Sequence, residues 1–219
     1  MRTRQILVAA AVGVVALIPA TAASAATLRV VSDAKNVFGE TATTVTSATS
    51  YIDSKGKTHK LAANTAMGQI VETGLPYTAV YDASYNAAYL TRIVGAKAPA
   101  TGYWAFYVND APSTLGATDA KLKTTDEVVW IVDNDYSNAN GPFAYDLNTK
   151  VNGDGTVTFT AMRFGANKAI AAGGAPLLVN GVKAANFDAK GRLTLPLSTG
   201  WTAQIPAKGK IAPSEIVAG

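Results

Sequence analysis

The sequence predicts a mostly β protein with two small domains: an α+β domain that contains one helix and, after it, a small antiparallel β-sandwich. Three observations predict this fold class. Short runs of alternating apolar and β-branched residues, separated by turn-forming residues, recur along the chain. Only one segment has convincing helical periodicity. A polar stretch over residues 134–142 divides the chain.

The first 25 residues have the pattern of a secretory signal peptide. Arg2 and Arg4 precede an apolar run over residues 6–20, and small residues lead to a cleavage site after Ala25. Pro19 ends this run before it reaches the roughly 20 residues that a membrane-spanning helix needs. We therefore expect a protein that is secreted or held at the cell envelope, outside the cytoplasmic membrane. We expect no membrane span after cleavage, and attachment to the envelope is left open.

The composition excludes several classes of partner and chemistry. Cleavage would leave 17 basic and 15 acidic residues, because Arg2 and Arg4 are lost and no acidic residue is. A net charge of +2 is too small to indicate a nucleic acid or an acidic membrane surface as the partner. The chain has no cysteine, which excludes disulfides, a thiol nucleophile and a lipidated cysteine. Its stability must therefore come from packed cores.

The first domain is expected over residues 26–133. Its helix begins where Asn64 or Thr65 can cap the first turn, presents Met67 and Ile70 on an apolar face, and ends before a Gly-Leu-Pro sequence. The other apolar runs predict strands over residues 28–31, 43–51, 78–81, 88–94, 103–108 and 127–132.

Residues 134–142 are interpreted as an interdomain linker, because they are polar, lack periodicity and end in Gly-Pro. The alternative is a calcium loop, since Asp133, Asp135 and Ser137 alternate as the first ligands of such a loop do. The later positions lack the glycine and the bidentate glutamate that this loop needs. We favour the linker, expect no metal site, and expect relative motion of the two domains.

The second domain is expected over residues 143–219. The sequence Asn-Gly-Asp-Gly at residues 152–155 predicts a tight turn between two strands, and Gly181 and Gly191 complete two further turn signals. This spacing favours a small antiparallel sandwich. Its strands are expected over residues 145–151, 156–162, 193–197 and 201–205.

The strand over residues 103–108 is rich in aromatic residues. Its side chains alternate between two faces, with Tyr103 and Tyr107 on one of them. Because both faces carry apolar groups, this strand and the last strand of the domain are expected near the centre of a sheet whose second face is partly covered. The expected core residues of this pair are Trp104, Phe106, Val108 and Trp130.

Residues 103–109 (YWAFYVN), 115–117 (LGA) and 121–130 (KLKTTDEVVW) resemble the pattern of the transcobalamin-like C-terminal domain. That domain is a β-grasp module common in exported bacterial proteins and related to the C-terminal domain of vitamin B12 carriers. The resemblance covers about residues 26–133 and implies a β-grasp fold. It leaves a corrinoid possible as a ligand, although the helical domain that embraces the vitamin in the carriers is missing. Asp110 stands where family members usually place glycine, a change that turns tolerate.

Residues 173–181 and 188–195 resemble the immunoglobulin-like or carboxypeptidase-regulatory-like repeats of bacterial surface proteins. This second resemblance implies a spacer or adhesion module for the C-terminal domain and implies no chemistry there.

Tyrosines supply the candidate binding surface. Four of them, at positions 77, 81, 85 and 89, are spaced by four, which on strands can place them on one face beside the aromatic strand. Such a surface can stack on a sugar, a corrin or a peptide, and the alternative is ordinary packing. We favour Asn109 as a turn former, with contact at a pocket mouth as the alternative. The candidate ligand-binding residues are Tyr81, Tyr85, Tyr103, Tyr107, Asn109, Leu115 and Gly116.

No catalytic motif is present. The single histidine, His59, lies in a basic turn and is expected on a solvated face, and the chain has neither a G-x-S-x-G elbow nor a histidine pair for zinc. We therefore expect a non-catalytic exported binding protein without a resident cofactor. Its ligand, a glycan, a corrinoid or another small molecule, is unassigned. The alternative is a structural or adhesive cell-surface spacer whose partner is a surface protein.

Overall fold

The computed structural model describes residues 26–43, 50–100, 102–133, 144–164 and 168–219. The predicted signal peptide with its cleavage site at Ala25 and the predicted linker over residues 134–142 lie outside the described residues. The predicted fold class is confirmed: the described chain is mostly β, with one helix and several small antiparallel sheets. No helix in these ranges is long and apolar enough to cross a membrane.

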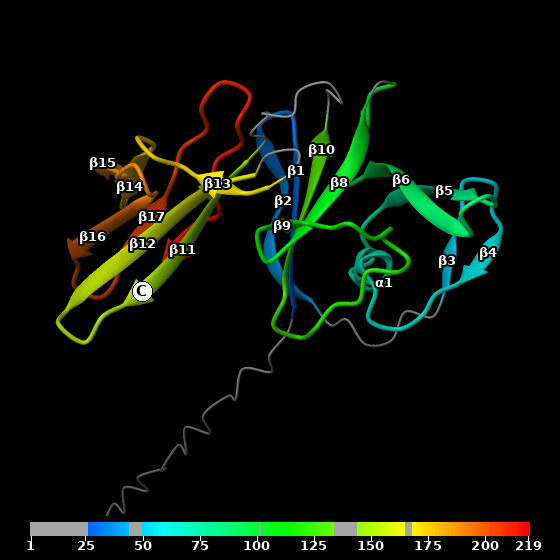
Figure 1. Cartoon of the computed structure of the whole chain (residues 1–219), viewed down its shortest axis with the longest axis horizontal. Helices are drawn as coiled ribbons and strands as arrows, with labels where there is room; N and C mark the ends of the chain where they lie inside the picture. Colours follow the sequence, from blue (N-terminus) through cyan, green and yellow to red (C-terminus); the bar gives the residue numbers. More distant parts are fainter. Residues whose placement is uncertain (1–25, 44–49, 101, 134–143, 165–167) are drawn as a thin grey trace, which may run out of the picture.

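A five-stranded sheet with the order β2-β1-β10-β8-β9 lies at the centre of the molecule (Figure 1). β1 pairs in parallel with β10, and the other neighbours are antiparallel. β10 is central, as expected, whereas β8 has only the two residues of β9 on its outer side. The strand bounds are β1 Ala26–Ser32, β2 Lys35–Thr43, β8 Tyr103–Val108, β9 Ala111–Pro112 and β10 Glu127–Asp133.

Strand β2 was not predicted from the sequence, and most of the predicted strand over residues 43–51 lies outside the described residues. Thr43 is the last residue of β2, and Ser50 is the first of β3 (Ser50–Ile52), with residues 44–49 outside the description. β2 is an edge strand whose residues are mostly exposed, so it has no buried face to produce an alternating pattern. Its pairing with β1 defines it instead.

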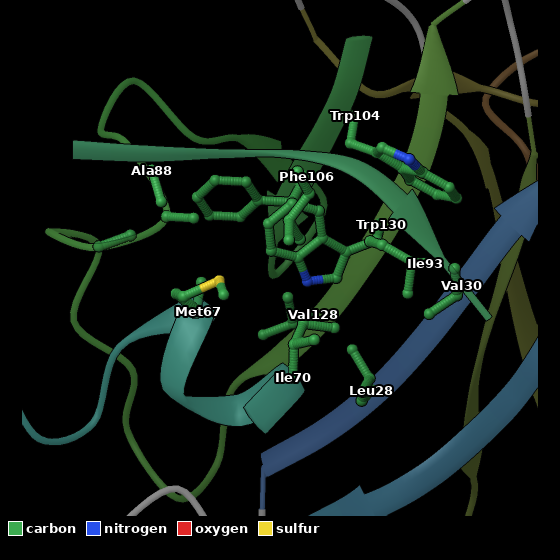
Figure 2. Close-up of a cluster of buried hydrophobic side chains, with 14 of the residues drawn as sticks. Leu28, Val30, Met67, Ile70, Ala88, Ile93, Trp104, Phe106, Val128 and Trp130 are labelled. Carbon is green, nitrogen blue, oxygen red and sulfur yellow. The ribbon is translucent and has the colours of Figure 1, made fainter. Parts of the chain in front are cut away.

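One face of the central sheet is covered by helix α1 (Ala66–Glu72) and by β6 (Ala87–Ile93). Figure 2 shows Met67 and Ile70 of α1 lying against Trp130 and its neighbours in the first hydrophobic core. The helix is confirmed where the sequence placed it. The other strands of this half are β3 with β4 (Thr58–Lys60), and β5 (Tyr77–Asp82), β6 and β7 (Ala96–Lys97).

The C-terminal half contains two antiparallel four-stranded sheets around a second hydrophobic core. The turn predicted at residues 152–155 joins the first two strands and has Gly155 at φ 79°. One sheet contains β11 (Tyr145–Val151), β12 (Thr156–Arg163), β13 (Ile170–Ala171) and β16 (Arg192–Pro196). The other contains β14 (Pro176–Val179), β15 (Val182–Asn186), β17 (Thr202–Gln204) and β18 (Val217–Ala218).

The second face of the central sheet contacts the C-terminal half. A third apolar cluster contains Tyr107, Val129 and Ile131 from this face and Phe164 from the C-terminal half. Arg29 of β1 is fully buried beside it, and the guanidinium donates hydrogen bonds to the Tyr145 carbonyl oxygen at 2.8 Å, to Glu215 Oε2 at 2.9 Å and to the Pro213 carbonyl oxygen. We call this contact the interface of the two halves. That the halves are independent domains stays a prediction.

Candidate functional site

A cavity of about 220 Å³ lies at the outer edge of β8, between that edge, β6 and the segment that follows β9. Most of its lining residues are aromatic or aliphatic. The side of β8 and β10 contributes Tyr103, Trp104, Phe106 and Trp130. The opposite sides contribute Ala88, Tyr89 and Leu90 of β6 and Leu115, Gly116 and Ala117 of the segment after β9.

Strand alternation and register place the aromatic wall. Trp104 and Phe106 point to the core face of the central sheet, where Figure 2 shows them beside Trp130. Phe106 is directly opposite Trp130 in the ladder, and their rings stack with centroids 4.7 Å apart. All three side chains are buried, and Val108 is half-buried against the same cluster. The wall is therefore part of the hydrophobic core and is held by it.

The turn between β8 and β9 is fixed by Asn109 and does not reach the cavity. Asn109 and Asp110 have φ values of 50° and 65°, the left-handed conformation that asparagine and aspartate tolerate. The Asn109 amide donates to Asp126 Oδ1 at 2.8 Å, and its side-chain oxygen accepts the Glu127 N–H at 2.9 Å. Asn109 is thus a turn former with bonded side-chain atoms, and it is not among the cavity-lining residues.

Ser113 turns the chain away from the edge of β8. Its N–H donates to the Phe106 carbonyl oxygen at 2.9 Å, and its hydroxyl group both accepts the Leu115 N–H at 3.2 Å and donates to the Leu115 carbonyl oxygen at 3.0 Å. Four residues later the segment contacts the start of α1, where the Met67 N–H donates to the Ala117 carbonyl oxygen at 2.9 Å. The cavity wall formed by this segment is therefore anchored at both of its ends.

Two of the residues that line the cavity have a buried donor without a partner. The indole N–H groups of Trp104 and Trp130 have no hydrogen-bond acceptor among the described residues, although the side chains are only 6% and 1% exposed. A buried donor without an acceptor costs about 1–3 kcal/mol, and such groups are uncommon in folded proteins. Both indole nitrogen atoms are themselves buried, so the exposed part of the cavity wall is formed by other atoms of these residues.

The predicted tyrosines do not form one surface. Tyr103 and Tyr107 both line the cavity. Tyr107 is buried, however, and its ring packs on Phe164 in the interface of the two halves, with ring centroids 4.8 Å apart. Tyr81 and Tyr85 are not cavity-lining residues, and Tyr85 is 80% exposed. Leu115 and Gly116 line the cavity.

Sequence reasoning left Tyr89 out of the candidate site, although it lines the cavity and is 53% exposed. Tyr89 is the last of the four tyrosines spaced by four, at positions 77, 81, 85 and 89, and this spacing was the signal that could have identified it. The two strands that carry this series separate its members. Tyr77 and Tyr81 pack against the first core, and Tyr89 follows the turn and reaches the edge of β8.

The expectation that His59 lies on a solvated face is wrong. Its side chain is 10% exposed, and its ring stacks between Tyr51 and Tyr81, with centroid distances of 5.1 and 4.1 Å. His59 Nε2 lies 2.8 Å from Asp53 Oδ2, and this hydrogen bond lowers the pKa of the Asp53 carboxyl. The β3–β4 hairpin turns the histidine inward onto tyrosines that are distant in sequence. In the described ranges no group of His, Asp or Glu side chains could hold a metal ion.

One part of the chain matches a known protein family. Residues 63–134 match the model of a domain of unknown function, DUF4430, a family associated with transcobalamin-like proteins. This segment runs from the residues before α1 to the end of β10 and contains every cavity-lining residue. The comparison with curated proteins found no match.

Proposed function

We propose that this chain is an exported, non-catalytic binding protein whose ligand enters the cavity at the edge of β8. The observation that carries the proposal is a cavity at the edge of β8 whose wall is formed by the aromatic residues Tyr103, Trp104, Phe106 and Trp130. Binding sites typically combine apolar walls with a few polar groups that fix the orientation of the ligand. Aromatic contact would supply affinity here.

The size of the cavity restricts the ligand. At about 220 Å³ it is smaller than the roughly 300 Å³ at which pockets begin to enclose drug-sized molecules. Tyr89 and Leu115 at its margin are 53% and 57% exposed, so the cavity lies at the protein surface. The cavity would therefore take one ring or side chain of a larger ligand, while the rest of that ligand stays outside.

A thermal-shift screen of the mature chain, residues 26–219, against glycans, corrinoids, peptidoglycan fragments and peptides tests the proposal. A ligand at about 100 times its dissociation constant should stabilise the fold by about 2.7 kcal/mol. Tyr89→Ala should weaken binding of any hit. Tyr85→Ala is the matched control, because Tyr85 is also exposed and lies outside the cavity lining. A hit that responds equally to both substitutions, or silence across the panel, would contradict the proposal.

A structural or adhesive spacer is the second candidate function. The buried contacts of Arg29 with Glu215 and Tyr145 favour it, because they join the two halves as a spacer would require. Most aromatic side chains at β8 would then serve packing alone. Silence in the ligand screen, together with unchanged stability in Tyr89→Ala, is the result that this candidate predicts.

A further inference from the structure

The hydrogen-bond register of β8 determines which of its backbone groups face outward. The Asn109 N–H donates to the Glu127 carbonyl oxygen at 2.9 Å, so these two residues form a hydrogen-bonded pair of the antiparallel ladder. Such pairs recur at every second residue, which places Ala105 in a bonded pair with β10 and leaves Phe106 and Trp104 between bonded pairs. The N–H and C=O groups of Phe106 and Trp104 therefore point to the outer edge.

Three of these four outward groups have no partner in the part of the chain that the structure describes. The Phe106 carbonyl oxygen accepts the Ser113 N–H. No described residue forms a hydrogen bond with the Phe106 N–H, the Trp104 C=O or the Trp104 N–H. Along the edge these groups are a donor, an acceptor and a donor, at the spacing of an extended strand.

The edge is open because β9 is short. β9 pairs with β8 only at Tyr107 and Val108, and the turn at Ser113 then carries the chain away. Unpaired strand edges are templates for pairing with another chain. An extended segment placed beside Trp104 would continue the pairing that β9 begins.

We propose that the outer edge of β8 binds an extended peptide as an added strand, and that one apolar side chain of this peptide enters the cavity. The inference rests on the proposed function and names its ligand class. A peptide backbone in strand conformation presents an acceptor, a donor and an acceptor in the complementary order. Ala88, Leu90 and Leu115 contribute aliphatic side chains on the sides away from the aromatic wall, which suit contact with an aliphatic or aromatic side chain.

Amide NMR of the mature chain, residues 26–219, titrated with a blocked hexapeptide that alternates threonine and leucine, tests this pairing. The resonances of the Trp104 and Phe106 amides should shift, and their hydrogen exchange should slow by about tenfold or more, because both N–H groups gain an acceptor.

N-methylation of the peptide at each position in turn tests the strand geometry. Only every second N–H of an added strand faces its neighbour. Methylation at alternate positions should weaken binding by about tenfold, and methylation at the positions between them should change it little. Binding through a side chain alone would not produce this alternation.

The cavity is tested by Leu115→Ala, with Ile52→Ala as the matched control. Both side chains are aliphatic and 57% exposed, but only Leu115 lines the cavity. Leu115→Ala should weaken the leucine peptide by roughly fivefold, because apolar contact is lost, and Ile52→Ala should leave its affinity unchanged.

Two results would overturn the inference: no amide shift at about 1 mM peptide, or binding that is indifferent to the position of the N-methyl group. The proposed function survives either result if a glycan or corrinoid stabilises the chain and Tyr89→Ala weakens that effect. The proposed function itself is contradicted by a different result, in which no class of ligand in the thermal-shift panel binds through the cavity.

Discussion

At the scale of single residues, two similar turn signals have different structural roles. Gly181 and Gly191 each complete a predicted turn and have φ values of 77° and 72°. A Cβ atom at Gly181 would meet nothing within 4 Å. At Gly191 it would collide with the Ala161 carbonyl oxygen of β12 and press on the Ala172 N–H. The sequence predicts both turns. It does not show that β12, from an earlier part of the chain, packs against the turn at Gly191.

Alanine at these two positions should therefore have unequal effects on the free energy of unfolding. Gly181→Ala should cost about 1–2 kcal/mol for the left-handed backbone alone. Gly191→Ala should cost roughly 3 kcal/mol or more, because the collision adds to the same backbone term. Urea unfolding of the two variants and the wild type measures both values. Equal losses would show that β12 gives way to the new methyl group.

At the scale of secondary-structure elements, local chemistry made α1 predictable. Thr65 caps the helix, and its hydroxyl accepts the Gly68 N–H at 3.1 Å, as the sequence signal required. The cavity was less predictable. Its aromatic wall follows from alternation in β8, but its openness depends on where β9 ends and on how Ser113 redirects the chain. The local sequence of β8 does not show that its outer edge lacks a pairing strand beyond Tyr107.

Removal of the cap should destabilise the first core. Thr65 is fully buried, so Thr65→Ala leaves the Gly68 N–H without its acceptor and should lower the free energy of unfolding by about 1–2 kcal/mol. Thr65→Ser keeps the hydroxyl and should recover most of this loss. Thermal unfolding of both variants compares them. If the two are equally destabilised, the lost methyl group and not the cap bond is responsible.

At the scale of the whole molecule, the interface of the two halves was not predicted from the sequence. The apolar second face of β10, with Val129 and Ile131, indicated that something covers it. The covering residue Phe164 and the acid that pairs with Arg29, Glu215, lie far along the chain in segments with no distinguishing pattern. Spacing in a sequence can show that a face is apolar, but it cannot name the surface that packs on it.

Carboxyl groups gather in this interface. Asp146 is 1% exposed, and the negative charges of Glu215, Glu127 and Asp110 act on its carboxyl. Burial, with the negative charge of Glu215 as the next cause, raises the pKa of Glu127 to about 7. The same two causes raise the pKa of Asp146 well above its usual value, against the opposing charge of Arg29. Burial and neighbouring negative charge both favour the protonated form of a carboxyl.

Stability should therefore fall as the pH rises from about 4.5 to about 7. Glu127 holds its proton more tightly in the folded chain, so its contribution is complete below its ordinary pKa of 4.5 and is lost as the pH passes about 7. The loss is up to about 3 kcal/mol. Denaturant unfolding across this range should show it. Glu127→Gln cannot ionise, so its stability relative to the wild type should rise with pH, even in about 1 M salt, which screens exposed charges. A difference that does not change with pH would mean that Glu127 is ionised throughout and that the interface holds no proton there.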